Sequence, residues 1–289
     1  MTLAHITEHR LGRGFVILAP PHEGLPPFSH MTYDPARHGR LLAEIQTLRG
    51  RAYLADGALD EAQLLPGGRH VQPVDDKSWH LLTVDDRGRV TAGIRYMAHR
   101  PGVSYSELAV SGAISHLPSN FTHKLRHAVE AELEKANDLG FTYVELGGWV
   151  VGEELRCSTE AIRMLLMMYA LSQSLGGAIA LSTATTRHNS SGILRRTGGR
   201  PLMVDGAEVP PYYDPHYGCE MEAVSFDSRL PNSRYSGWIR EFKEALLQIT
   251  MISAGPIENS TTGLLQLHSA VTGFGVPQHS EATVFDAVH

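Results

Sequence analysis

The residues best suited to chemistry lie between positions 141 and 175. A run rich in aromatic and β-branched residues, Phe141 to Val151, is typical of a β-strand and carries one acid, Glu145. Gly147 and Gly148 follow it, and glycines inside a strand pattern indicate a bulge or the close approach of another group to the backbone. We therefore predict a kinked strand that presents a carboxylate.

A long, largely buried helix is expected directly after this strand. Beyond the polar turn Gly152 to Thr159, the apolar residues recur with a period of about 3.6 up to Leu175. The first turn of a helix has unpaired N–H groups and a positive dipole end, which suit an anion such as a pyrophosphate. Arg156 stands just before that turn, and Ser158 and Thr159 are candidates to cap it. The pattern predicts a phosphate cradle beside the kinked strand.

The rest of the chain predicts an α+β fold in which helices cover a mixed sheet. We interpret residues 1–34 and 229–289 as extensions of a domain at 35–228. For the last forty residues or so, which are rich in Ser, Thr and Gly, we predict no helix or strand. We predict a loop at 212–218. The expected helices lie at 35–54, from 119 to about 138, at 190–196 with Asn189 as a cap, and at 232–249. The expected strands lie at 79–84, 89–97, 178–185, 200–204 and 219–226, and Phe15 to Ala19 is a short apolar run within the first extension.

Bulk properties narrow the function. The 289 residues carry a net charge of −6, which argues against a general nucleic-acid binder. Two cysteines far apart, Cys157 and Cys219, form no disulfide framework, and no stretch is long and apolar enough for a membrane span. We expect a cytoplasmic protein. The 16 histidines show no metal-binding spacing, so no metal site is predicted.

Three motifs resemble the GNAT acyltransferase superfamily, in particular its branch of acyl-homoserine-lactone synthases and N-acyl amino acid synthases. They are WHLLTVDDRGRVTAGIRYMAHRP, YVELGGWVV with the helix after it, and STATTRHNSSGILRRTGG, and the resemblance covers roughly Ala36 to Ser228. It implies a GNAT-like mixed, mostly antiparallel β-sheet flanked by helices. It also implies an N-acyltransferase that moves an acyl group, such as a fatty acyl chain, from acyl carrier protein or acyl-CoA to the amine of an amino-acid-like acceptor.

The resemblance assigns roles in such a transfer. Glu145 would accept the ammonium proton of the acceptor, directly or through water. Backbone N–H groups from Gly148 through Trp149 to Val150 would polarise the thioester carbonyl. Tyr217 would protonate the departing thiolate. The phosphopantetheine thioester would act as a co-substrate, with no tightly bound cofactor.

Two further groups of residues complete the expected site. The carrier would be held by Val150, Val151, Arg156, Ser158, Thr159, Glu160 and Ala161, with Arg195 and Arg196 in a basic cluster that can meet acyl carrier protein or a nucleotide phosphate. The acceptor would be bound by Arg51, Asp76 and Arg95. Each of these residues has an ordinary structural alternative: a strand ion pair for Glu145 and Arg95, a loop acid for Asp76, core packing for Tyr217 and a solvated helix face for the arginines.

Alternatives to this function remain. Autoinducer synthases have Ser-Arg where this chain has Gly147-Gly148, and the GNAT pyrophosphate signature has Gly where this chain has Thr159. An autoinducer synthase is thus a second hypothesis, and a non-catalytic protein that binds acyl thioesters a third. The oligomeric state stays open, with a homodimer as one option.

Overall fold

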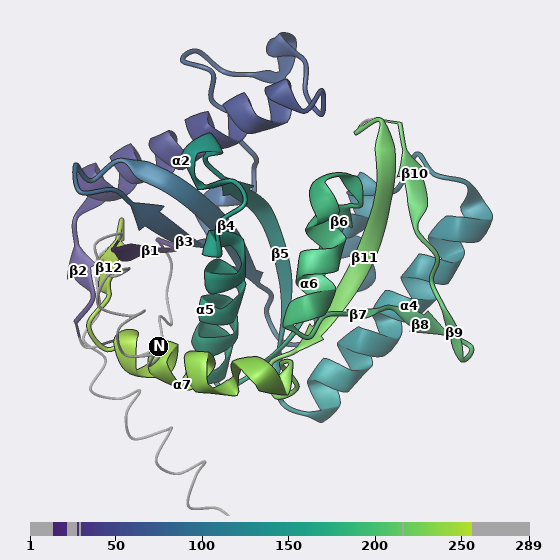
Figure 1. Cartoon of the computed structure of the whole chain (residues 1–289). Helices are drawn as coiled ribbons and strands as arrows, with labels where there is room; N and C mark the ends of the chain where they lie inside the picture. The colour runs from purple at the N-terminus through teal and green to yellow at the C-terminus, as the bar shows by residue number, and fades with distance from the viewer. Residues whose placement is uncertain (1–13, 22–27, 29, 216, 256–289) are drawn as a thin grey trace, which may run out of the picture. The chain divides into compact units, whose positions relative to one another are not determined.

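The structure is a computed structural model that describes residues 14–21, 28, 30–215 and 217–255 (Figure 1). Its helices are α2 Pro35–Ala55, α3 Ala109–Ala113, α4 Ser119–Asp138, α5 Glu160–Ser174, α6 Ser190–Thr197 and α7 Ser236–Ala245. Its strands are β1 Phe15–Ala19, β2 Thr32–Tyr33, β3 Trp79–Val84, β4 Val90–Ala98, β5 Thr142–Val151, β6 Ala178–Thr185, β7 Arg200–Pro201, β8 Met203–Val204, β9 Ala207–Glu208, β10 Tyr212–Asp214, β11 Cys219–Asp227 and β12 Thr250–Ser253.

The described strands form one large mixed sheet and the small hairpin β8–β9. The large sheet has the order β10-β11-β6-β5-β4-β3-β1-β12-β2, with β7 paired to β11. The pairs β5/β6, β1/β12 and β12/β2 are parallel, and the others are antiparallel. The predicted mixed, mostly antiparallel sheet flanked by helices is confirmed.

Strands β5 and β6 separate from each other halfway along their length (Figure 1). They pair in parallel from Thr142 opposite Ala178 to Leu146 opposite Ser182. Beyond that point β5 pairs only with β4, and β6 only with β11. The central sheet is therefore split at one end, between two strands that are adjacent at the other.

The predicted kink in β5 is a β-bulge. Gly147 lies opposite Arg95 and Val150 lies opposite Gly93, so two residues of β5 face one residue of β4. Gly148, in the bulge, has a φ of +59°, which glycine adopts without strain. A bulge leaves an extra residue outside the regular ladder of hydrogen bonds, here just where β5 leaves β6.

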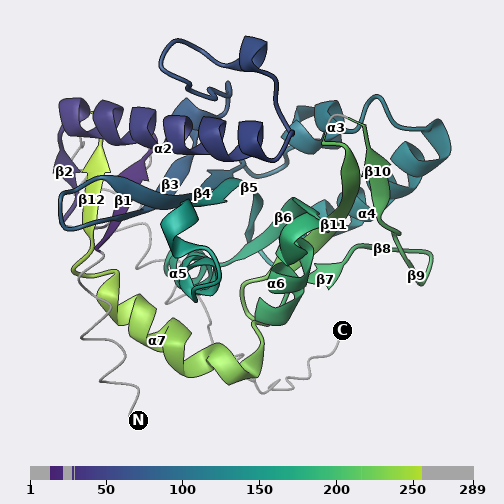
Figure 2. The ribbon, with the colours of Figure 1, turned by 45° about the horizontal axis from the view of Figure 1, so that its top comes forward.

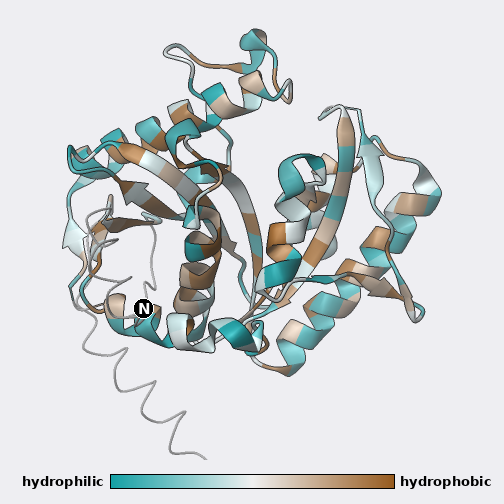
Figure 3. Ribbon diagram, viewed as in Figure 1, coloured by the Kyte–Doolittle hydropathy of each residue, from teal (hydrophilic) through white to brown (hydrophobic). Residues whose placement is uncertain are grey.

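Helices cover both faces of the sheet, with α2 and α4 on one face and α5, α6 and α7 on the other (Figures 1 and 2). Successive side chains of β5 alternate between the faces: Val144 and Leu146 pack with α5, whereas Tyr143 packs in the cluster that contains residues of α4. The middle of α5 is apolar around most of its circumference (Figure 3), because it is buried beneath α7 as well as against the sheet. The expected long, buried helix is confirmed.

Most expected elements are confirmed, with exceptions at the sheet edges. The segment 200–204 is two short strands instead of one, and residues 212–214 of the expected loop form β10. The described parts of the two expected extensions add three strands to the large sheet, β1 and β2 from the first and β12 from the second. Asn189 begins α6 in a left-handed conformation, and its side chain makes no capping hydrogen bond. In the described residues, no helix is long and apolar enough to cross a membrane.

Candidate functional site

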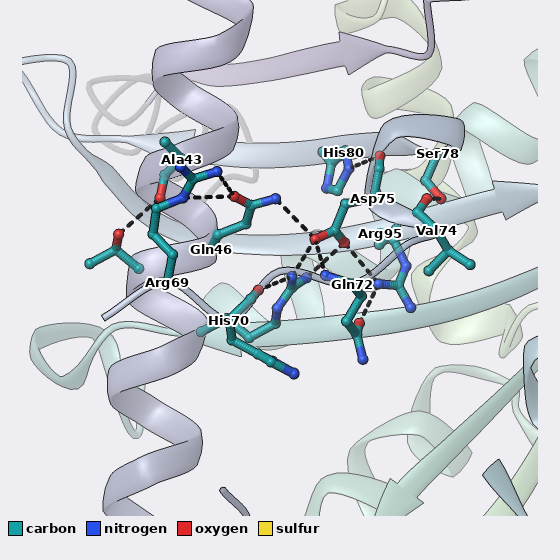
Figure 4. Close-up of polar contacts among 12 residues, drawn as sticks. Ala43, Gln46, Arg69, His70, Gln72, Val74, Asp75, Ser78, His80 and Arg95 are labelled. Carbon is teal, nitrogen blue, oxygen red and sulfur yellow. Dashed lines mark hydrogen bonds and ion pairs between the residues drawn. The ribbon is translucent and has the colours of Figure 1, made fainter. Parts of the chain in front are cut away.

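A buried cluster of two arginines, Arg49 and Arg95, and one aspartate, Asp75, lies beside the bulge. Figure 4 labels Asp75 and Arg95. Arg49 of α2 contacts Asp75, with 2.6 Å between Nη2 and Oδ2, and Arg95 of β4 contacts the same carboxylate, with 2.9 Å between Nη1 and Oδ1. The Gln46 side chain and the Gln72 backbone N–H each donate to Oδ2 of Asp75 at 3.0 Å. Arg49 is 0% exposed and Asp75 1%. Side-chain motion here is therefore strongly restricted.

This cluster carries more positive than negative charge. Burial disfavours ionisation of Asp75, but the hydrogen bonds and charge of Arg49, the Gln72 N–H and the charge of Arg95 outweigh it and hold the pKa of Asp75 well below its usual range. Burial, together with the charge of Arg49, lowers the pKa of Arg95. The Nε atoms of both arginines are buried without a hydrogen-bond partner. Two guanidinium groups thus share one carboxylate, an arrangement that favours a further anion.

The two glycines of β5 make room for these arginines. A methyl group added at Gly147 would lie 3.1 Å from Nη2 of Arg95, and one added at Gly148 would lie 2.8 Å from Nη1 of Arg49. The arginines therefore pack directly over the backbone of the bulge. Any larger residue there would displace a guanidinium.

Two tyrosines reach the same region, one from α2 and one from the loop before β11. Tyr53 of α2 and Tyr217, in the loop before β11, interact electrostatically with each other and with both Arg49 and Arg95. Burial raises the pKa of Tyr53, and it raises the pKa of Tyr217 well above its usual value. The two phenols are therefore protonated near neutral pH.

Arg187 ties together the segments at the split end of the sheet. It follows β6, and its guanidinium donates to the carbonyl of Asp56, just past α2, and to that of Gly218 at 3.0 Å. His188, next in the chain, contacts the Asp56 carboxylate at 3.2 Å between Nε2 and Oδ1. The end of α2, the loop after β6 and the loop that carries Tyr217 are thus linked.

Glu145 is held by three hydrogen bonds. Its Oε2 accepts from Nε2 of His99 at 2.8 Å and from the N–H of Ala109 at 2.9 Å, and its Oε1 accepts from the N–H of Val110 at 2.8 Å. The donors at Ala109 and Val110 are the first two residues of α3. Glu145 points to the same face as Arg95, since it lies two residues from Gly147 on the strand. It anchors α3 to the sheet.

In the expected phosphate-binding segment, the residues just before α5 are exposed and the first acid of the helix is buried. Arg156, Ser158 and Thr159 are exposed before α5, and Oγ of Ser158 caps the helix by accepting from the N–H of Glu160 at 3.1 Å. The Glu160 side chain, by contrast, is buried in an ion pair with Arg163 at 2.7 Å. Both the side chain and the backbone N–H of Glu160 are thus engaged within the protein.

The other predicted residues are scattered around this centre. Trp149 and Val151 pack with the α5 core, Val150 packs with α2, and Ala161 is half-buried in the first turn of α5. Arg195 is paired with Glu222, whereas Arg196 is exposed. Arg51 and Asp76 are exposed, and it is their near neighbours Arg49 and Asp75 that join Arg95.

One signal in the sequence points to Arg49. It lies four residues after Ile45, on the apolar face of α2 that also includes Leu41. No comparable signal separates Asp75 from Asp76, because both lie in the short turn Asp75–Lys77.

A narrow apolar cavity lies between α5 and the sheet. Its volume is about 20 Å³, room for about one water molecule. Its lining includes Leu146, where β5 and β6 separate, and Ala178, at the start of β6. The remaining lining residues are Leu165, Met168, Tyr169, Ser172, Ala180, Phe226 and Ser228. Among the described residues, no group of three or more His, Cys, Asp or Glu side chains could hold a metal ion.

Solved structures similar to this chain are enzymes that transfer acyl groups. One is a CoA-dependent acyl-homoserine lactone synthase, BjaI, with SAM and isopentyl-CoA: 15% identity, TM-score 0.49, 88% of this chain and 100% of that chain covered. Another is FeeM, an N-acyl amino acid synthase from uncultured soil microbes, with 12% identity and a TM-score of 0.43, where the match covers 69% of this chain and 89% of that chain. A third is an acyl-CoA N-acyltransferase from Pseudomonas aeruginosa, with 11% identity and a TM-score of 0.41, where the match covers 74% of this chain and 98% of that chain.

These are the classes of protein that the sequence motifs resemble, but identities this low transfer no residue's role. The chain matches no protein-family model and no curated protein.

Proposed function

We propose that this protein is an N-acyltransferase that moves an acyl group from an acyl-CoA or acyl carrier protein thioester to the amine of a carboxylate-bearing acceptor. The observation that carries the proposal is the Arg49–Asp75–Arg95 cluster packed against the bulge at Gly148. It combines excess buried positive charge with an irregular backbone at the point where β5 and β6 separate. Such a reaction needs a cationic group that binds the acceptor close to a backbone N–H group that polarises the thioester carbonyl.

The arginines would bind the carboxylate of the acceptor. Arg95 is the more accessible of the two, with a side chain that is 10% exposed against 1% for Arg49. A planar guanidinium orients a carboxylate in a way that a lysine ammonium does not. Arg95 would therefore fix the acceptor, while Arg49 and Asp75 fix Arg95. An amine without a carboxylate would lose this orientation.

The bulge would polarise the thioester carbonyl. An N–H group released from the ladder near Gly148 to Val150 can donate to the oxyanion that forms when the amine attacks. The acyl chain would then run from Leu146 into the apolar cavity under α5, which would have to widen to take it. As the C–S bond breaks, the proton that the attacking nitrogen loses passes to the departing thiolate, and Tyr217, a protonated phenol, stabilises that thiolate with a hydrogen bond.

Glu145 would remove the proton of the acceptor ammonium, through water. Its three hydrogen bonds hold the carboxylate in a fixed orientation. The pantetheine phosphates would meet Arg156 and the backbone N–H groups of the first turn of α5. Arg196, exposed on α6, is an additional cation for the carrier.

The test is thiol release from a series of acyl-CoA thioesters of different chain length, with amino acids as acceptors. Each amino acid is compared with its carboxamide and with its decarboxylated amine. We expect turnover with the amino acid and a loss of about tenfold or more in kcat/KM for the two analogues, the size expected for a charge-assisted pair. Arg95→Gln should abolish that difference. Equal kcat/KM for the amino acid and its two analogues would refute the proposal. So would the absence of thiol release with every combination of thioester and acceptor.

A further inference from the structure

Three main-chain carbonyls accept hydrogen bonds from the guanidinium of Arg187, just after β6. Its Nη1 donates to the carbonyl of Asp56, and its Nη2 donates to those of Tyr217 and Gly218, at 3.3 and 3.0 Å. Along the chain, Asp56 is 131 positions from Arg187 and Tyr217 is 30. One side chain therefore joins the end of α2 to the loop that carries Tyr217.

The end of α2 suits a cation with several donors. Asp56 is the C-terminal cap of α2, and the last carbonyls of a helix lack partners within the helix and lie at the negative end of its dipole. A guanidinium has five N–H donors in a fixed plane, so it bonds to carbonyls of two segments at once. A lysine ammonium has one nitrogen and does not reproduce this bridge. The position of the loop relative to α2 therefore depends on an arginine.

The loop places Tyr217 beside the arginine cluster. Tyr217 packs against the apolar cluster that contains Leu181 of β6. Leu181 pairs with Glu145 of β5, so the phenol lies on the face of the sheet to which Glu145 points. It also interacts electrostatically with Arg49 and Arg95. Fixing the backbone of this loop therefore fixes the phenol at the site.

We propose that Arg187 is a positioning residue that holds the Tyr217 phenol where it donates a hydrogen bond to the thiolate leaving the acyl donor. This inference rests on the proposed function and identifies what orients its leaving-group donor. In that step the C–S bond breaks, sulfur keeps the bonding electron pair, and the thiolate takes up the proton lost by the attacking nitrogen. Arg187 and Tyr217 keep their own protons. Without Arg187, the loop loses its hydrogen bonds at Tyr217 and Gly218, and the phenol is no longer held in one position.

The experiment compares two acyl donors that differ in their leaving group, an acyl-CoA and the S-phenyl thioester of the same acid. With the acyl-CoA, Tyr217→Phe and Arg187→Lys should each lower kcat by about tenfold, the size of one hydrogen bond to a charged group. The double variant should be no slower than Tyr217→Phe, because both changes remove the same contact. A thiol of lower pKa leaves faster, so with the S-phenyl thioester each loss should be less than about twofold.

Two controls separate positioning from general damage. Arg187→Lys keeps the positive charge, so the KM for acyl-CoA should not change. A variant that folds badly would lose activity with both donors, whereas a misplaced phenol affects the poorer leaving group. Arg126→Lys is the matched substitution elsewhere: Arg126 of α4 is hydrogen-bonded to Glu130 at 2.8 Å, and both rates should stay at the wild-type value.

The outcomes distinguish this inference from the proposed function. An equal loss of kcat with both donors in Arg187→Lys, or losses that add in full in the double variant, would overturn the inference and leave acyl transfer standing. A wild-type kcat in Arg187→Lys or in Tyr217→Phe would do the same. If the wild-type protein releases no thiol from either donor with any acceptor, the proposed function fails, and the inference fails with it.

Discussion

Gly148 lies directly under Arg49, so that a methyl group on its α-carbon would be 2.8 Å from Nη1 of the guanidinium. The same glycine has a φ of +59° in the bulge of β5. Two separate demands therefore meet at one residue: a left-handed backbone and no side chain. The bulge and the buried arginine cluster depend on each other.

Gly148→Ala is expected to destabilise the protein by more than its backbone conformation alone would. A left-handed alanine costs about 1–2 kcal/mol, and the displaced Arg49 adds the loss of buried contacts with Asp75. Gly102→Ala is the control, because Gly102 has a φ of +72° and open space around its α-carbon. Denaturant unfolding should show a clearly larger loss for Gly148→Ala. Equal losses would mean that Arg49 moves aside freely.

Asp75→Asn should lower the free energy of unfolding by about 3 kcal/mol. Removing the carboxylate leaves two buried guanidinium groups without their shared anion, and breaking a buried pair typically costs about 3–5 kcal/mol. The adjacent Asp76 is exposed, so Asp76→Asn should change stability by no more than about 0.5 kcal/mol. Both are measured by urea denaturation at pH 7. Similar values for the two variants would contradict the structure of the cluster.

Periodicity and turn chemistry predicted the central elements because their signals are local. The bulge was predicted from Gly147-Gly148 alone, and the hairpin from the Asp and Gly residues that join β3 to β4. By contrast β12, four residues long, is held by β1, which is far away in the sequence, and β10, three residues long, pairs with the next strand, β11. Strands so short carry too little pattern to be distinguished from loops.

Only those site residues that lie within a strong local sequence pattern were predicted. Arg95 and Gly148 lie within strong strand patterns, and both are at the centre of the cluster. Choosing Asp75 over Asp76 requires knowing that α2 passes above that turn, a tertiary fact. The cap that Glu145 provides for α3 could not be foreseen, since a five-residue helix has no periodicity of its own.

The buried His80 should make stability depend on pH between about 4 and 6.5. Burial lowers the pKa of His80 from 6.5 to about 4 in the folded protein, although its bond to the Asp75 carbonyl opposes this. Between these values the unfolded chain binds the proton and the folded chain does not. The contribution is therefore fully present above pH 6.5 and declines as the pH falls, by about 3 kcal/mol in total.

Unfolding measured at pH 7 and pH 4.5 checks this. Burial also lowers the pKa of His38, so part of the wild-type slope comes from that residue. His80→Gln should remove most of the slope, and a slope unchanged in this variant would show that His80 is protonated in the fold. Asp75 does not interfere in this window, because its lowered pKa makes it lose stabilisation only below about pH 4.

Glu145→Gln separates a catalytic carboxylate from a purely structural one. Both oxygens of Glu145 accept hydrogen bonds, whereas a glutamine has one accepting oxygen, so at least one bond to α3 or His99 is lost and stability falls by about 1–3 kcal/mol. His99→Gln disturbs the same contact but keeps the carboxylate. If Glu145 is the base, Glu145→Gln lowers kcat by about 10²-fold or more, while His99→Gln lowers it only slightly. Equal kcat in the two variants, measured well below their unfolding temperatures, would leave Glu145 as the anchor of α3 and move the search for the base to water held elsewhere in the site.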